Sequence, residues 1–216
     1  MRLALFGPPG AGKGTQAKRL AQTHGLDHLS TGDLFRAAIR DGSDLGRRVD
    51  ALIRAGELVP DDLTNEVVAE RFRTISHADF VLDGFPRTVA QAQWLLGHLA
   101  EADAPLDAVV SLRVPAEDVV QRLSRRRTHP ETGAIYHLDF NPPPPDVPEG
   151  ELVHRPDDHP DAIRHRLDVY ERDTAPVEAF LRAHVRFFEV DGTGSLEDVQ
   201  ERVGEALAET RGVSGV

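Results

Sequence analysis

A glycine-rich segment near the start of the chain restricts the possible folds more than any other feature. Gly7-Pro8-Pro9-Gly10-Ala11-Gly12-Lys13-Gly14-Thr15 follows a short apolar stretch, residues 3–6, and precedes a helical pattern that ends near His24. The spacing Gly7-x4-Gly12-Lys13 between a strand and a helix is that of a phosphate-binding loop (P-loop). Glycines let successive backbone N–H groups turn toward phosphate oxygens, and the helix N-terminus adds partial positive charge. We therefore predict a nucleoside triphosphate site in which Lys13 reaches the β- and γ-phosphates.

The rest of the chain alternates short apolar runs with helical patterns. Runs suited to buried strands recur at residues 80–82, 108–112 and 185–190, with a weaker one at 28–29. Helical patterns cover residues 34–39, 45–55, 62–72, 89–99, 116–125, 162–181 and 196–207. Pro60 followed by Asp61 and Asp62 indicates a helix start, since acidic groups suit the positive end of the helix dipole. This alternation predicts an α/β fold: a P-loop parallel sheet with helices on both faces.

Residues from about 126 to 158 depart from the alternation. They have little helical period and contain the run Asn141-Pro142-Pro143-Pro144-Pro145. A structureless loop of that length is uncommon inside a compact domain, so we expect a small subdomain or a functional lid. The turn-like Pro130-Glu131-Thr132-Gly133 before residues 134–137 predicts a small β hairpin. The last residues, 211–216, are expected to fray.

Composition excludes several classes of protein. The net charge of −11 argues against a broad nucleic-acid surface. No apolar run approaches the 18 residues of a membrane span, and the apolar start is too short for a signal peptide. The chain has no cysteine, which excludes disulfides, iron–sulfur clusters and cysteine-bound zinc. We therefore expect a cytoplasmic protein with no nucleic-acid or membrane partner.

Two further motifs point to a second phosphate site. The apolar run 80–82 ends in Asp83, and an acid at that place commonly orients magnesium, directly or through water. The segment 83–88, Asp-Gly-Phe-Pro-Arg-Thr, places Arg87 just beyond this strand, and the segment 30–36, Ser-Thr-Gly-Asp-Leu-Phe-Arg, places Arg36 one turn into a helix. Ligands of open α/β sheets lie beyond the carboxyl ends of the strands, so Arg87 is expected to face the same crevice as Lys13.

Together these motifs resemble those of the adenylate kinases, which transfer a phosphoryl group between ATP and AMP. The resemblance covers essentially the whole chain, from the P-loop to Val190-Asp191-Gly192-Thr193, and its most specific part is the segment 83–87 followed by Gln91. It implies a core made of residues 1–29, 60–125 and 159–216. It also implies a helical nucleoside-monophosphate (NMP) segment, residues 30–59, and a small β-rich lid, residues 126–158.

The resemblance also implies a role for individual residues. Gln91 would read the adenine edge of AMP through its amide, and Thr88 is typical of the adenylate rather than the uridylate/cytidylate branch. AMP would be bound by Thr31, Arg36, Glu57, Leu58, Val59, Gly84, Phe85, Pro86, Arg87, Gln91, Arg155 and Arg166. ATP would be bound by Gly10, Ala11, Gly12, Lys13, Gly14, Thr15, Arg126, Ile135, Tyr136 and Gly194. The catalytic residues would be Lys13, Arg36, Arg87, Arg126, Arg155 and Arg166.

The implied reaction is MgATP + AMP = 2 ADP, which serves adenine nucleotide homeostasis and purine salvage. Asp83 would orient magnesium through water, with no protein ligand bound directly to the metal. No zinc is expected, because the lid lacks the cysteines that bind it in some relatives; His129, Thr132 and Asp146 are candidates for a polar network instead. Arginine suits the site because its planar fork binds oxyanions at two points and keeps its proton. The partners are ATP, AMP and ADP, and the chain is expected to be a monomer.

Two alternatives remain at this point. A kinase with the same fold could prefer UMP or CMP as acceptor, or GTP as the other nucleotide, although Gln91, Thr88 and the long lid argue against the pyrimidine version. A nucleotide-dependent switch or ATPase could act on a protein partner. Such a protein would not need a second arginine-lined phosphate site.

Overall fold

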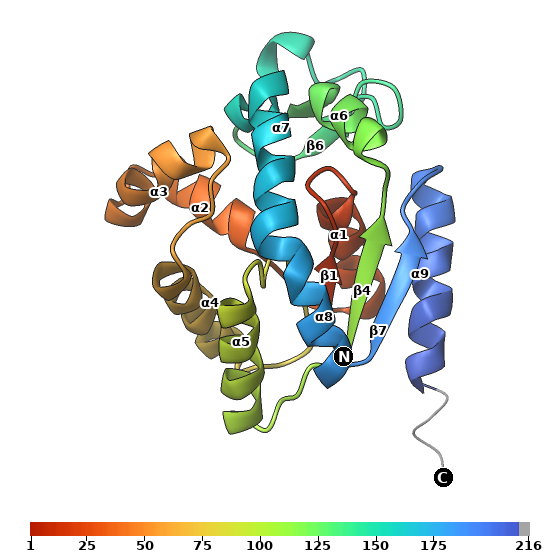
Figure 1. Cartoon of the computed structure of the whole chain (residues 1–216). Helices are drawn as coiled ribbons and strands as arrows, with labels where there is room; N and C mark the ends of the chain where they lie inside the picture. Colours follow the sequence, from red (N-terminus) through yellow and green to blue (C-terminus); the bar gives the residue numbers. More distant parts are fainter. Residues whose placement is uncertain (212–216) are drawn as a thin grey trace.

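The structure, a computed structural model, describes residues 1–211, except for the side chains of residues 149, 210 and 211. Residues 212–216, in the tail expected to fray, lie outside the described residues. Within the described part, the centre of the molecule is a parallel sheet with strand order β2-β3-β1-β4-β7 (Figure 1). Its strands are β1 (Arg2–Phe6), β2 (Asp27–Ser30), β3 (Phe80–Asp83), β4 (Ala108–Arg113) and β7 (Phe187–Asp191). This confirms the predicted parallel α/β sheet.

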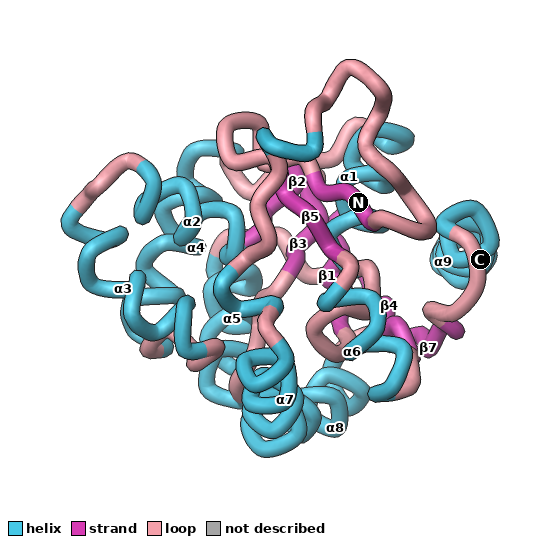
Figure 2. The backbone as a smooth tube through the Cα atoms, turned by 90° about the horizontal axis from the view of Figure 1, so that it is seen from above, coloured by secondary structure: helices cyan, strands magenta, loops and turns pink. Residues whose placement is uncertain are grey.

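Helices cover both faces of the sheet, as the alternation predicted (Figure 2). One face is covered by α4 (Asp61–Ile75), α5 (Val89–Glu101) and α8 (Ala175–His184), through buried side chains such as Phe72, Leu95 and Leu181. The opposite face is covered by α1 (Lys13–His24) and α9 (Leu196–Arg211), through side chains such as Leu20 and Val203. The continuous apolar strands are therefore buried on both sides, as expected of a parallel sheet.

The strand register brings the predicted motifs to one edge of the sheet. Ser30 pairs in register with Asp83, and Asp83 pairs with Leu5, two residues before the P-loop begins. The segments that follow β1, β2 and β3 therefore leave the sheet side by side at its carboxyl edge, the edge at which such sheets bind ligands.

A helical hairpin lies beside this edge. It consists of α2 (Thr31–Arg40) and α3 (Asp44–Ala55), capped by the hydroxyls of Ser30 and Ser43. Phe35 and Val49 pack with Val59 and neighbouring side chains into a small core separate from the two sides of the sheet. The helices cross at Gly46, where a Cβ would lie 2.1 Å from the carbonyl oxygen of Ala38. Only a glycine allows so close an approach.

Above the sheet, residues 126–158 form an insertion that contains a second, two-stranded sheet (Figure 1). Helix α6 (Ala116–Ser124) leads into an antiparallel pair, β5 (Arg126–Thr128) and β6 (Ile135–His137), in which Thr128 pairs with Ile135. The predicted hairpin is confirmed, and a bridge from Thr128 to Val153 joins the returning chain to it. Two short 3-10 turns, η1 (Glu149–Glu151) and η2 (Pro156–Asp158), complete the insertion.

The pattern over residues 162–181 predicted a helix, and the structure confirms it, with one irregular turn that the pattern did not indicate. The structure has α7 (Pro160–Val169), then a π-helical turn, η3 (Tyr170–Thr174), and then α8. Here the N–H of Ala175 donates to the carbonyl of Tyr170, five residues back. Pro176 comes next; a proline has no N–H, and its ring clashes with the carbonyl four residues earlier. The wider turn accommodates it without breaking the rod visible in Figure 1.

None of the helices within residues 1–211 is both long and apolar enough to cross a membrane.

Candidate active site

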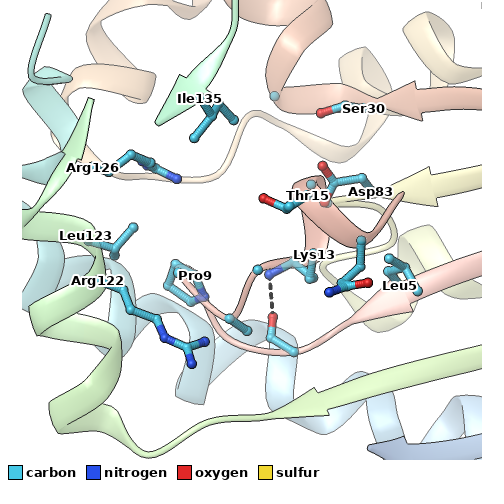
Figure 3. A pocket seen from close by; sticks show the side chains of 18 of the residues that line it. Leu5, Pro9, Lys13, Thr15, Ser30, Asp83, Arg122, Leu123, Arg126 and Ile135 are labelled. Atoms are coloured by element: carbon cyan, nitrogen blue, oxygen red, sulfur yellow. Dashed lines mark hydrogen bonds between the residues drawn. The ribbon is translucent and has the colours of Figure 1, made fainter. Parts of the chain in front are cut away.

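The P-loop is a tight backbone turn held by its own lysine. The ammonium of Lys13 donates to the carbonyl oxygens of Gly7 and Pro8, each at 2.7 Å. Figure 3 draws one of these two hydrogen bonds as a dashed line. Gly7 has φ +127°, and a Cβ there would lie 2.5 Å from the carbonyl oxygen of Leu112. Any larger residue at this position would push the loop away from β4. The loop therefore owes its position against the sheet to this glycine.

A cleft extends from the P-loop to the insertion above it. In Figure 3, Lys13, Thr15 and Asp83 lie across this space from Arg126 and Ile135. The residues that the resemblance implies for ATP all line the cleft: Gly10, Ala11, Gly12, Lys13, Gly14, Thr15, Arg126, Ile135, Tyr136 and Gly194. They come from the loop before α1 and the first turn of that helix, from the β5–β6 hairpin and from the segment before α9, and the fold brings all of them together.

A second, smaller cavity lies between the α2–α3 hairpin and the segment after β3. Its lining includes most of the residues implied for AMP: Thr31, Arg36, Glu57, Leu58, Val59, Gly84, Arg87, Gln91 and Arg166. The other three implied residues, Phe85, Pro86 and Arg155, line the first cleft. Arg36, Arg87 and Arg166 line both. The two cavities therefore meet at a group of arginines.

Two buried acids, Asp157 and Asp158, contact two arginines of the site, Arg126 and Arg166. Asp158 accepts from Arg126 at two points, at 2.6 and 2.7 Å, and its Oδ1 also lies 3.1 Å from NH1 of Arg166. The same NH1 forms an ion pair with Oδ2 of Asp157 at 2.9 Å and donates to the backbone carbonyl of Asp157 at 3.0 Å. Arg155, which is 6% exposed, donates instead to the hydroxyl of Thr128 at 2.8 Å. Sequence reasoning missed Asp157 and Asp158, because nothing in their local pattern indicates which cations they face.

The other buried cations of the site, Lys13, Arg87 and Arg155, each have a lowered pKa. Burial, together with the charges of Arg87, Arg166 and Arg126, lowers the pKa of Lys13 to about 7, against the opposing effect of Asp83. Burial and the neighbouring Arg166 lower the pKa of Arg87 to about 10. Burial and Arg126 lower the pKa of Arg155 to about 9. Buried cations that repel one another mark a site for a polyanion, which would stabilise their charged forms.

Asp83 lies beside the P-loop with chemistry suited to a hydrated magnesium ion. Burial raises its pKa, but the neighbouring His28 and Lys13 outweigh burial and hold the pKa below its ordinary value. Nε2 of His28 lies 3.7 Å from Oδ2 of Asp83 and is buried without a hydrogen-bond partner among the described residues. A carboxylate and an unsatisfied polar nitrogen fit the water shell that Mg²⁺ usually keeps. The residues present therefore fit magnesium held through water.

Gln91 lies in the second cavity at the start of α5, 2% exposed. Its carbonyl oxygen accepts from the backbone N–H of Arg87 at 2.7 Å, and its amide nitrogen donates to Asp61 at 2.7 Å. Asp61 also accepts from the hydroxyl of Thr88 at 2.8 Å. Sequence reasoning recognised Asp61 only as part of a helix start, and no sequence signal linked it to a residue thirty positions away.

Two other features differ from expectation or were missed. Within the described insertion, the N–H of Thr132 donates to the ring of His129 at 3.4 Å, but no hydrogen bond or ion pair joins Asp146 to either. His129 instead lies 3.6 Å from Glu151. Arg122, which sequence reasoning did not single out, lines the first cleft (Figure 3) and donates to the carbonyl of Gly192 at 2.9 Å.

Comparison with known proteins agrees with this geometry. Residues 5–185 match the family model described as adenylate kinase. An adenylate kinase from Salinibacter ruber is 49% identical over 207 residues, which cover 96% of this chain and 98% of that protein. One from Chloroherpeton thalassium is 44% identical, with 96% and 98% coverage, and one from Archaeoglobus fulgidus is 42% identical, with 97% and 98%. The family model and these relatives match the chain over nearly its whole length, and the structure has a P-loop facing a group of arginines. The chain therefore belongs to the adenylate kinase family.

Proposed function

We propose that this chain catalyses the reversible transfer of the γ-phosphoryl group of MgATP to AMP, which yields two ADP. The observation that carries the proposal is the meeting of two cavities at Arg36, Arg87 and Arg166. One cavity begins at the P-loop and accommodates a triphosphate. The other contains Gln91 and accommodates the acceptor. In the cell this activity would serve adenine nucleotide homeostasis and purine salvage.

The reaction requires little covalent chemistry of the protein. A phosphate oxygen of AMP attacks the γ-phosphorus of ATP; a new P–O bond forms while the bond to the β–γ bridging oxygen breaks, and ADP leaves. The attacking phosphate is already ionised near neutral pH, so no general base is needed. Lys13 would hold the β- and γ-phosphates, and Arg36 and Arg87 would hold the AMP phosphate. Arg126, Arg155 and Arg166 would stabilise the transferring group.

Magnesium would be held through water by Asp83, beside the P-loop. When bound, it neutralises charge on the β- and γ-phosphate oxygens. Asp83 would orient the water shell, with the imidazole of His28 as a neighbouring hydrogen-bonding group.

Three parts of the chain would move relative to one another. We propose a core of residues 1–29, 60–125 and 159–216, an NMP segment of residues 30–59 and a lid of residues 126–158. Closure of the lid would exclude water from the γ-phosphate, a role that lids have in adenylate kinases. The cleft contains every proposed catalytic residue from one chain, which supports a monomer as the active unit.

A coupled phosphoryl-transfer assay with MgATP and each of AMP, CMP, UMP and GMP tests the proposal. We expect selective use of AMP, and a fall in kcat/KM of about 10²–10³-fold in Arg87→Ala, the loss typical of one transition-state charge partner. Arg48→Ala, which removes an exposed arginine of α3, is the matched control and should leave the activity unchanged.

The same assay separates the alternatives. Preference for CMP or UMP would keep the fold and the mechanism but contradict the assignment of Gln91, and repeating the assay with MgGTP tests the alternative donor. Release of ADP at a rate indifferent to every monophosphate would contradict the kinase and favour an ATPase or switch.

A further inference from the structure

The amide of Gln91 is held at both ends by groups that cannot exchange roles. Its Oε1 accepts from the backbone N–H of Arg87, and its Nε2 donates to Oδ1 of Asp61, each at 2.7 Å. A backbone N–H can only donate, and a carboxylate can only accept. Reversing the amide would place N–H against N–H on one side and carbonyl against carboxylate on the other. The orientation of the Gln91 amide is therefore determined by these two partners.

Asp61 is itself oriented by a hydrogen-bond chain between α4 and α5. The backbone N–H of Gln91 donates to the hydroxyl of Thr88 at 3.1 Å. That hydroxyl donates its own proton to Oδ2 of Asp61 at 2.8 Å. Both carboxylate oxygens of Asp61 are thus engaged from α5, one by the side chain that caps this helix and one by the Gln91 amide. The chain of donors runs in one direction and ends at the carboxylate.

The two protein partners leave part of the amide for a ligand. A primary amide has two N–H donors and two carbonyl lone pairs, of which one each is occupied here. The amide therefore keeps one donor and one acceptor beyond these two partners, on a side chain that lines the second cavity. A 6-aminopurine offers the complementary pair: an amino donor at C6 and an acceptor at N1. A 6-oxopurine offers the opposite pair, an acceptor at O6 and a donor at N1.

We propose that Asp61 is a positioning residue that makes the acceptor site select 6-aminopurine over 6-oxopurine monophosphates. It acts through Gln91, by holding the amide in the one orientation that matches adenine. The inference rests on the proposed function, in which this cavity binds AMP. Charge-assisted hydrogen bonds are the strong ones, so the carboxylate opposes reversal more than a neutral partner would.

The test measures kcat/KM for AMP and for IMP, with MgATP, in the full-length chain and in Asp61→Asn. An asparagine amide offers a donor or an acceptor to Gln91, so the reversed amide loses its main penalty. We expect the AMP-to-IMP ratio of kcat/KM to fall by about tenfold or more, the value of one hydrogen bond to a charged group. Asp62→Asn is the matched control, because it removes the neighbouring charge from the same helix end on an exposed side chain. Asp62→Asn should keep the AMP-to-IMP ratio of the unsubstituted protein.

A second pair of variants keeps the test decisive if Asp61→Asn folds poorly. Thr88→Val removes the hydroxyl that orients Asp61 and should shift the ratio in the same direction, whereas Thr88→Ser should retain it. A proportional loss for both acceptors in Asp61→Asn, with the ratio unchanged, would show a merely structural role and overturn the inference. A parent protein that prefers AMP in that experiment still satisfies the proposed function. A parent protein that phosphorylates no AMP contradicts the proposed function itself.

Discussion

Arg126 and Asp158 form a two-point ion pair in the wall of the cleft, with nitrogen–oxygen distances of 2.6 and 2.7 Å. The carboxylate of Asp158 is completely buried, and it also contacts Arg166. One acid therefore orients two of the arginines proposed to hold the transferring phosphoryl group. Their guanidinium planes are positioned by the protein itself, which lowers the ordering cost of binding.

Asp158→Asn should destabilise the chain in the absence of nucleotide. Removing the charge leaves buried arginines without their counter-ion, a change that costs about 3 kcal/mol in the free energy of unfolding. Nucleotide phosphates supply replacement charge, so ADP should raise the melting temperature of the variant more than that of the parent. Thermal unfolding with and without ADP measures both effects. Asp161→Asn, at a 98% exposed side chain of α7, is the control; an equal loss there would refute the explanation.

Nucleotide binding should take up protons above pH 7. Burial and neighbouring arginines lower the pKa of Lys13 to about 7, so much of it is neutral in the ligand-free protein at pH 8. A polyphosphate stabilises the ammonium and raises its pKa, hence binding draws in a proton and weakens as the pH rises from 7 to 9. Calorimetric titration with MgATP at pH 8, in two buffers of different ionisation enthalpy, counts the protons. Uptake should disappear in Lys13→Met; its absence from the parent protein would contradict the prediction.

Gly46→Ala and Gly97→Ala should have opposite effects on stability. At Gly46 the added methyl would lie 2.1 Å from the carbonyl oxygen of Ala38, so α2 and α3 must separate at a cost of about 1–3 kcal/mol. At Gly97, inside α5, nothing lies within 4 Å, and alanine should stabilise the helix by about 0.5–1 kcal/mol. Urea unfolding measures both. Because α2 and α3 contribute the proposed AMP segment, Gly46→Ala should also raise the KM for AMP and leave that for ATP unchanged.

Arg36→Ala should separate the two substrates. The side chain of Arg36 lines the second cavity and lies 2.7 Å from Asp33 on the same helix. Its loss removes a contact to the acceptor phosphate and should lower kcat/KM for AMP by about 10²-fold, with little change in the KM for ATP. Arg40→Ala, one turn further along α2 on an exposed side chain, should behave as the parent in steady-state kinetics. Equal effects on both substrates would contradict the assignment.

The parts of the fold that were predictable depend on local signals. The P-loop, the buried strands and the start of α4 each follow from a few adjacent residues, such as Gly7 or the pair Asp61-Asp62. The role of Asp158 was not predictable, because Arg126 lies 32 positions earlier and their meeting depends on how the insertion returns to α7. Asp61 was visible only as a helix start. Its contact with Gln91 requires α4 and α5 to pack side by side, and the hydrophobic pattern of each helix does not predict which helix is its neighbour.

The π turn before α8 is a local feature that hydrophobic periodicity does not predict. The apolar pattern continues through Pro176, and we predicted a helix over this stretch with no change in its hydrogen bonding. The wide turn at Tyr170–Thr174 reconciles the two signals: the rod continues, and the missing N–H of the proline is accommodated. The same turn places the hydroxyl of Thr174 2.9 Å from the carbonyl of Arg87.

This wide turn has a consequence for chain length. Each residue of an α-helix advances the side chains by about 100° around the axis, so the π turn sets the angle between Arg166 on one side of it and Val177 on the other. Deleting one residue from the turn would straighten the hydrogen bonding, yet it would rotate Arg166 away from the cleft whenever Val177 and Leu181 stayed against the sheet. The four prolines at 142–145, which line neither cavity, have no such constraint. Insertions and deletions should therefore be tolerated there and excluded from the stretch between Arg166 and Val177.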